Sequence, residues 1–185
     1  LLDSYHDERA LAADDNIRNS TRSTDFITPK TAASRLMRDA VLGLARDHAF
    51  ARPLVNSGRL SLPTRYVGSP IVSDEADSFN APAAAPGSVC PDAPVALPDG
   101  SPCWLLEMLG AGFTLLFEGA DPLASIAMDA LPVPVTRLRI GHDLVDSRGV
   151  LGQRLDVRNQ AVYLIRPDQV VAARWRSATA AEVRR

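Results

Sequence analysis

The chain has 185 residues, of which 46% are apolar and 23% are charged, the composition of an ordinary soluble globular protein. Twenty basic side chains against twenty-two acidic ones give a net charge of −2, so nothing indicates nucleic acid or an anionic membrane as a partner. No apolar run approaches the roughly 20 residues that span a bilayer. Charge begins at the third position, which excludes a signal peptide. We therefore expect a cytoplasmic protein.

The N-terminal third predicts a helical arm. Residues 1 to about 21 contain no Gly or Pro and carry a thin, half-polar stripe at helical spacing, so this helix needs a neighbour. Because the sequence lacks an initiating Met and starts inside this helix, we expect a piece of a longer protein. After a connector, Thr28 is a good N-cap and Pro29 a good first residue for a second helix, which ends near Arg52. Its apolar face is Leu36, Met37, Ala40, Val41, Leu44, Ala45, His48 and Ala49.

A change in composition predicts a domain boundary. Residues 55–72 are expected to be extended and loop-like. Residues 73–88 are acidic and rich in Pro and Ala, a composition that cannot build a core. We therefore divide the chain into a helical arm (1–72), a linker (73–88) and a C-terminal domain (89–185).

The C-terminal domain alternates strands with helices. The expected elements are an edge strand at 93–97, helical turns at 104–109, a strand buried on both faces at 113–118, a crossover helix at 123–130, a strand at 133–140, a short helix at 150–155, a hairpin of strands at 162–165 and 170–175 with its turn at 166–169, and a final helix at 178–183. A βαβ unit followed by a ββα unit on one mixed sheet is the thioredoxin-like plan. We predict an α/β fold of this kind, preceded by the helical arm.

The loop after the central strand is where such a fold usually does its chemistry. A thiol oxidoreductase needs a thiolate at the start of the following helix, where the helix dipole lowers its pKa. Residues 119–125 hold no cysteine; Asp121 is instead a candidate helix cap, with Pro122 at the first helical position. Cys103 precedes the central strand by ten residues and cannot reach that place. The sequence therefore argues against thiol catalysis.

Other candidate residues have structural explanations. Cys90 and Cys103 match no zinc or redox spacing and are interpreted as free thiols, although a disulfide is geometrically open if the segment folds back. His6 and His48 are interpreted as surface or boundary histidines. His142 and Asp143 are adjacent on a chain expected to be extended, so their side chains should point to opposite faces and not form an acid–base dyad.

Arg137 and Arg139 share one strand face, where they are either solvated or paired with acids; a ligand role is open but has no support in the sequence. The sequence contains no G-x-S-x-G elbow, no P-loop and no G-x-G-x-x-G. We assign no catalytic, cofactor-binding or metal-binding residue to this chain.

Several blocks of the sequence are similar to one known family. They are residues 1–9 (LLDSYHDER), 26–29 (FITP), the helix end 49–52 (AFAR), 58–61 (GRLS), Pro86-Gly87 with 91–94 (PDAP), 104–106 (WLL) with 112–116 (GFTLL), and 163–168 (YLIRPD) with 171–175 (VAARW). Together they resemble the end of the FAD domain and the C-terminal thioredoxin-like domain of flavin-dependent aromatic hydroxylases. The similarity is to the single-component phenol and 3-(3-hydroxyphenyl)propionate hydroxylase type.

Two positions depart from that family's pattern. The family often has Pro soon after the Glu-Arg pair, where Ala10 stands here, and Gly after Arg-Pro-Asp, where Gln169 stands here. Gln169 indicates a turn that does not need a glycine-only conformation. Neither departure changes the assignment.

The resemblance implies a parent enzyme that uses FAD and NAD(P)H to hydroxylate phenolic rings. The family's FAD-binding motifs are not found in these 185 residues, so the fragment itself is expected to be non-catalytic and to hold no cofactor. Its expected partner is the upstream FAD-binding domain of the same protein, with a homodimer left open. The alternative is a free-standing, redox-inactive thioredoxin-like module for protein interaction.

Overall fold

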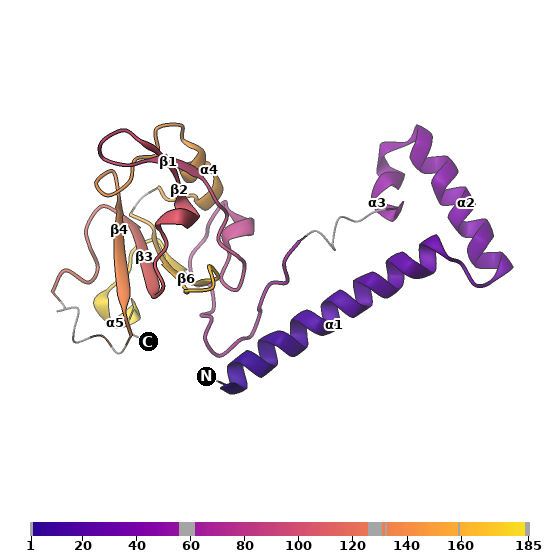
Figure 1. The fold of residues 1–185 in the computed structure, drawn as a ribbon, viewed down its shortest axis with the longest axis horizontal. Helices are drawn as coiled ribbons and strands as arrows, with labels where there is room; N and C mark the ends of the chain where they lie inside the picture. Colours follow the sequence, from indigo (N-terminus) through magenta and orange to yellow (C-terminus); the bar gives the residue numbers. More distant parts are fainter. Residues whose placement is uncertain (1, 56–61, 126–130, 132, 159, 184–185) are drawn as a thin grey trace. The chain divides into compact units, whose positions relative to one another are not determined.

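The computed structural model describes residues 2–55, 62–125, 131, 133–158 and 160–183. By its internal contacts the chain divides into two compact units, Leu1–Thr64 and Arg65–Arg185 (Figure 1). This division falls before the predicted linker at 73–88, so the linker residues lie in the second unit.

The first unit is helical. It comprises α1 (Leu2–Ile27), α2 (Ala32–Asp47), the 3₁₀ turn η1 (Ala49–Ala51) and α3 (Arg52–Val55). The predicted helical arm is therefore present, but α1 continues about six residues beyond the expected end near residue 21. No Gly or Pro occurs between Leu2 and Ile27 to stop it sooner.

The predicted cap of the second helix is wrong. The hydroxyl of Thr28 donates to the carbonyl oxygen of Thr24 at 2.7 Å and so belongs to the end of α1. The N-cap of α2 is Thr31, whose side-chain oxygen accepts from the backbone N–H of Ser34 at 3.1 Å. Two threonines three residues apart are equally good caps by residue type, and the longer α1 occupies the first of them.

The second unit is built on a mixed four-stranded sheet with the order β4-β3-β5-β6. Its strands are β3 (Phe113–Glu118), β4 (Val135–Ile140), β5 (Val162–Ile165) and β6 (Val171–Trp175). β3 and β4 are parallel, whereas β3–β5 and β5–β6 are antiparallel. The predicted bounds of β3 and β5 are confirmed, and β4 and β6 begin two and one residues later than expected.

A second, two-stranded sheet pairs β1 (Pro94–Ala96) with β2 (Pro102–Trp104) in antiparallel register. The predicted strand at 93–97 thus belongs to a separate hairpin, followed by the 3₁₀ turn η4 (Leu105–Met108). The short helices α4 (Val150–Leu155) and α5 (Ala180–Val183) also lie where the sequence predicts them. The predicted crossover helix at 123–130 falls largely on residues 126–130, which lie outside the described residues.

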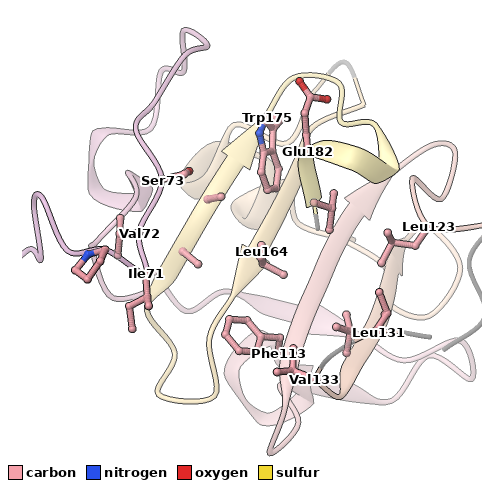
Figure 2. Close-up of a pocket in the computed structure, with 15 residues that line it drawn as sticks. Ile71, Val72, Ser73, Phe113, Leu123, Leu131, Val133, Leu164, Trp175 and Glu182 are labelled. Atoms are coloured by element: carbon pink, nitrogen blue, oxygen red, sulfur yellow. The ribbon is translucent and has the colours of Figure 1, made fainter. Parts of the chain in front are cut away.

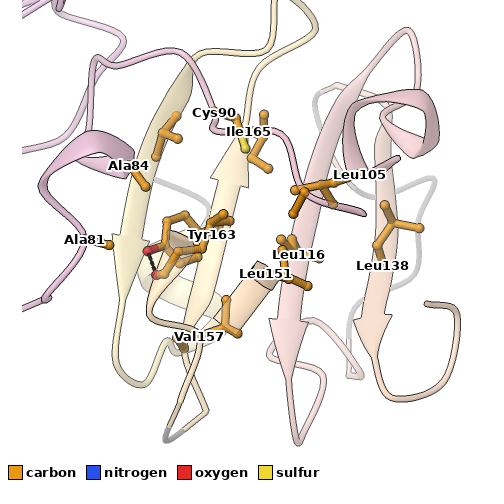
Figure 3. Packing of buried hydrophobic residues seen from close by; sticks show 14 of the residues in the cluster. Ala81, Ala84, Cys90, Leu105, Leu116, Leu138, Leu151, Val157, Tyr163 and Ile165 are labelled. Atoms are coloured by element: carbon orange, nitrogen blue, oxygen red, sulfur yellow. Dashed lines mark hydrogen bonds between the residues drawn. The ribbon is translucent and has the colours of Figure 1, made fainter. Parts of the chain in front are cut away.

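Both faces of the four-stranded sheet are covered by apolar side chains. One face packs Leu116, Leu138 and Tyr163 against α4, η4 and the β1–β2 hairpin (Figure 3). The other face carries Leu115, Phe117 and Val162 with the partly buried Leu164 and Trp175. Leu115 and Leu116 have no exposed surface, so the prediction that β3 is buried on both faces is confirmed.

The phenol of Tyr163 fixes the first of these faces. Its hydroxyl donates to the carbonyl oxygen of Leu155 at the end of α4 (Figure 3). Burial raises the pKa of Tyr163 to about 12, and the nearby Arg174 opposes that rise only in part. Tyr163 is therefore a neutral structural donor at physiological pH.

The Pro/Ala-rich stretch contributes to the core, contrary to expectation. Ala81, Ala84 and Ala85 are buried, with η3 (Pro82–Ala84) packed at the edge of the first apolar face. The backbone N–H groups of Ser73 and Gly87 donate to carbonyl oxygens of β6 at 2.8 Å each. Small side chains let this segment approach β6 closely, so a composition that cannot form its own core still completes that of the sheet.

The turn between β5 and β6 also differs from expectation. Gln169 has a φ of 66°, in the left-handed region that favours glycine, and its N–H donates to the carbonyl oxygen of Arg166 at 2.9 Å. The prediction that this turn avoids a glycine-type conformation is therefore wrong. The hairpin geometry sets the backbone here and Gln169 adopts it with strain.

Candidate functional site

The turn after β3 is the first place to examine for chemistry. One carboxylate oxygen of Asp121 accepts from the backbone N–H of Leu123 at 2.8 Å, which is the contact a capping residue makes, although most of the helix that it was predicted to cap falls outside the described residues. The other accepts from Arg137 of β4 at 2.9 Å, and the same guanidinium donates to the carbonyl oxygen of Leu123 at 3.0 Å. Asp121 and Arg137 have about a quarter or less of their side chains exposed. The ion pair and these hydrogen bonds therefore hold the turn against β4.

This turn does not fit the pyrophosphate of a flavin dinucleotide. A phosphate site at a strand–turn–helix junction needs backbone N–H groups and no competing negative charge. Here the carboxylate of Asp121 accepts the N–H of Leu123 and lies against Arg137. The ion pair also answers the question left open for Arg137, which is paired with an acid.

The two cysteines do not form a redox pair. Cys90 and Cys103 are both free thiols, as the sequence predicts. Burial raises the pKa of the Cys90 thiol to about 12, and the charge of Asp92 adds to the rise. Desolvation and the carboxylate of Glu107, which accepts from Cys103 at 3.4 Å, raise the pKa of Cys103 as well. Both thiols are protonated at neutral pH and are poor nucleophiles.

His142 and Asp143 do form a pair, which corrects the sequence prediction. Strand β4 ends at Ile140, and the chain then turns, so neighbouring side chains no longer point to opposite faces. The Nδ1 atom of His142 lies 2.8 Å from a carboxylate oxygen of Asp143. The other carboxylate oxygen accepts from the backbone N–H of Arg139 at 2.7 Å.

His142 and Asp143 lie as close together as the two members of an acid–base dyad, but their surroundings are not those of a catalytic site. That backbone hydrogen bond is the main cause that lowers the pKa of Asp143, so the carboxylate is ionised and is a turn cap first. The side chain of His142 is 73% exposed. The hydrogen bond of His142 leads to a carboxylate that caps a turn and not to a nucleophile, so the pair lacks the partner that acid–base catalysis requires.

Neither a metal centre nor a membrane span is found in the described part of the chain. No group of three or more His, Cys, Asp and Glu side chains is arranged to hold a metal ion there. No helix among the described residues combines the length and the apolar character needed to cross a bilayer. The remaining histidines, His6 and His48, are exposed on α1 and at the end of α2.

The most distinctive surface belongs to the first unit. Its described helices bury a single apolar residue, Ala51. The predicted apolar face of α2 is present but uncovered, because Leu36 and Met37 are 74% and 71% exposed and no described residue of α2 is buried. The described residues of the first unit expose twelve large apolar side chains, which we refer to together as the arm face: Tyr5, Leu11, Ile17, Ile27, Leu36, Met37, Leu42, Leu44, Phe50, Leu54, Val55 and Leu62. Exposed apolar side chains in this number, on helices that bury almost nothing of their own, are typical of a segment that contacts a partner.

No protein-family model matches the chain. Individual relatives do. The chain is 29% identical to aklavinone 12-hydroxylase RdmE of Streptomyces purpurascens over 98% of its own length and 32% of the relative's. It is 28% identical to a 3-(3-hydroxyphenyl)propionate/3-hydroxycinnamic acid hydroxylase of Mycobacterium sp. (strain KMS) over 99% of its own length and 35% of the relative's. The chain thus spans about a third of each.

Solved structures give the same result. The flavin-dependent monooxygenase PieE, solved with FAD and substrate, matches 83% of the chain and 28% of its own length at 29% identity and a TM-score of 0.54. The rebeccamycin biosynthetic enzyme RebC, solved with reduced flavin, covers 97% of the chain and 34% of its own length with a TM-score of 0.61, and at 23% identity it supports the fold alone. The resemblance to flavin-dependent aromatic hydroxylases is therefore confirmed along nearly the whole chain.

Proposed function

We propose that the chain is the C-terminal part of a flavin-dependent aromatic hydroxylase, an FAD-containing and NAD(P)H-using monooxygenase that acts on phenolic rings. The relatives named as hydroxylases support this proposal, because the similarity extends over 98–99% of the chain and only about a third of theirs. In such an enzyme the flavin supplies the oxygen-activating chemistry. The part proposed here for the chain is structural: it packs against the catalytic domain and supports assembly.

The observation that carries the structural role is the arm face. Leu36, Met37 and Phe50 are each more than 70% exposed, although they lie in a helical unit with almost no buried apolar surface of its own. Burying an exposed Leu or Phe side chain contributes about 1.5–3 kcal/mol. A helical unit that exposes a dozen large apolar side chains is therefore expected to be covered at least in part in the working protein.

We propose that the upstream FAD-binding domain of the same protein covers the arm face. The relatives have about two thirds of their length outside the region that this chain matches, so a large partner is available in the same polypeptide. Such a partner needs no free encounter, because the covalent link supplies a high local concentration. A second copy of this chain is the competing occupant.

The second unit fits a scaffold role. Its mixed four-stranded sheet, with one parallel pair and one hairpin, supports the proposal of a thioredoxin-like scaffold. The place where a thioredoxin carries its nucleophile is held by the ion pair of Asp121 and Arg137. These features support a thioredoxin-like scaffold without thiol chemistry, whether inside the hydroxylase or as the free-standing interaction module.

The first test is the complete reading frame that contains the chain. We expect it to encode G-x-G-x-x-G upstream, and the full protein to absorb as a flavoprotein and to oxidise NAD(P)H in the presence of a phenol. A reading frame without that motif, yielding a colourless protein, would favour the free-standing module.

The second test addresses the arm face. The 185-residue chain and the separately expressed upstream domain are mixed and separated by size-exclusion chromatography, where we expect them to elute together. Replacing Leu36 and Met37 by Asp should abolish co-elution, whereas Arg35→Glu, next to them on the charged side of α2, should leave it nearly unchanged. The alternative outcome is that the chain associates with itself and does not bind the upstream domain. If the double variant abolishes that self-association, the arm face belongs to a homodimer and the proposed partner is wrong.

A further inference from the structure

A hollow of about 400 Å³ lies on one face of the four-stranded sheet, entirely within the second unit. Its floor is formed by Phe113, Leu164 and Trp175 of β3, β5 and β6 (Figure 2). Ile71 and Val72 stand on one side of it, and Leu123 with Leu131 on the other. Its volume lies within the roughly 300–1,000 Å³ usual for small-molecule sites.

The sheet itself creates the space. Leu115, Leu164 and Ala173 are neighbours in register across β3, β5 and β6, and so share this face. Ala173 has only a methyl group where its cross-strand neighbour Leu164 carries a larger side chain, and Ala172 beside it in β6 is equally small, which leaves room above the floor. The wall of residues 70–73 is anchored, because the N–H of Ser73 donates to the carbonyl oxygen of Ala172 at 2.8 Å. The hollow is thus a consequence of a small residue beside a fixed wall.

The lining selects a flat apolar occupant. Figure 2 shows the rings of Phe113 and Trp175 at opposite ends of the floor, with the aliphatic Leu164 between them. Aromatic rings interact favourably with other rings in offset-stacked or edge-to-face arrangements. The polar groups among the lining side chains are the hydroxyl of Ser73, the indole N–H of Trp175 and the carboxylate of Glu182. A fused-ring aromatic molecule matches this distribution.

The charge of the lining further narrows the ligand class. Glu182 is the one charged residue among those that line the hollow. Its carboxylate accepts from the backbone N–H and the hydroxyl of Thr179 at 2.8 and 2.7 Å, which holds it at the start of α5. Arg137 shares the sheet face but is paired with Asp121. Glu182 is exposed, so its charge lies at the rim of the hollow. A ligand that carries its own carboxylate would lose hydration inside the hollow, where none of the lining residues is cationic, and would also be repelled by Glu182 at the rim.

We propose that this hollow is a binding site for a neutral, fused-ring aromatic molecule, which lies against β3, β5 and β6 between the rings of Phe113 and Trp175. The proposal concerns the second unit alone and does not depend on what covers the arm face. It assigns no reaction to the site.

Trp175 reports on occupancy. The chain contains two tryptophans, and the second, Trp104, lies in β2 with 48% of its surface exposed. In the full chain with Trp104→Phe, emission comes from Trp175 alone. We use 9-anthracenemethanol as the neutral probe and 9-anthracenecarboxylate as its anionic match, since anthracene accepts energy from tryptophan only at short range. Saturable quenching by the alcohol, with at least about tenfold weaker binding of the carboxylate, is expected.

Two substitutions connect the quenching to this site. Ala173→Leu fills the hollow and should abolish saturable quenching while the circular dichroism spectrum is retained. Glu182→Gln keeps the capping group but removes its charge, so it should reduce the preference for the alcohol to less than about threefold. Leu36→Ser, on the arm face, is the control and should leave both affinities unchanged.

Several results would overturn the proposal. Quenching that never saturates, or that survives Ala173→Leu in a folded protein, would place the probe elsewhere. Equal binding of the alcohol and the carboxylate in the unsubstituted background would reject the neutral ligand class. If Ala173→Leu does not fold, Glu182→Gln alone decides, because unaltered selectivity in that variant would mean that the probe lies away from the carboxylate.

Discussion

Both units of this chain contain elements with a clear apolar pattern, but the apolar residues are exposed in the first unit and buried in the second. In the first unit, α2 has a clear apolar stripe, yet Leu36 in that stripe is 74% exposed. In the second unit, β3 has a short apolar run, and Leu116 within it has no exposed surface. The difference teaches that an amphipathic pattern predicts an element and the face that needs covering. It does not predict whether the cover is contained in the same chain.

Separating the two units should have the largest effect, which is a difference in how cooperatively they unfold. We expect residues 65–185 to unfold cooperatively on heating, because this unit has apolar clusters on both faces of its sheet. Residues 1–64 should melt gradually and weakly, since helices without a packed face are marginal in water. Circular dichroism melts of both pieces check this. A sharp transition in 1–64 would mean that its helices stabilise one another without a partner, and the comparison would fail.

The same residue type tests the contrast within the intact chain. Leu116→Ala removes a side chain from the core of the second unit and should lower the free energy of unfolding by about 2–5 kcal/mol. Leu36→Ala, on the arm face, should change it by less than about 0.5 kcal/mol. Urea unfolding followed by circular dichroism measures both. Comparable losses would show that Leu36 is packed in solution.

The ion pair after β3 should give an intermediate effect. Asp121→Ala leaves the N–H of Leu123 without its acceptor and Arg137 without its carboxylate partner, so a loss of about 1–3 kcal/mol is expected. Asp39→Ala breaks the exposed pair of Arg38 and Asp39 on α2 and should cost less than about 1 kcal/mol. Added salt should weaken the second effect more than the first. The opposite ranking would place Asp121 in solvent rather than in a structural turn.

Local signals predicted much of the second unit. The bounds of β3 and β5 followed from apolar runs between turn residues, and the hydrogen bond from the N–H of Leu123 to the Asp121 carboxylate followed from residue type. The cap of α2 was misplaced because Thr28 and Thr31 are equivalent by type, and only the length of α1 decides between them. The Pro/Ala-rich stretch was misjudged because its alanines are buried against β6, a contact distant in sequence.

The sites were harder to predict than the elements. The pair of His142 and Asp143 was missed because it depends on β4 ending at Ile140, and strand ends are the least certain part of a prediction from pattern. The hollow on the sheet had no sequence signal at all. Phe113, Leu164 and Ala173 come from three strands and look like ordinary core residues, so only the register that places them on one face makes them a candidate site.

The smallest predicted effect concerns one turn and compares a single substitution in two conformations. Gln169 has a φ of 66°, where a side chain costs about 1 kcal/mol and glycine costs nothing, so Gln169→Gly should raise the free energy of unfolding by about 0.5–1 kcal/mol. Gln153 lies in α4, where glycine is unfavourable, so Gln153→Gly should lower it by a similar amount. Urea unfolding of both variants measures the two signs. Losses in both would mean that the Gln169 side chain contributes contacts that outweigh its backbone strain, and the hairpin turn would then be held by more than backbone geometry.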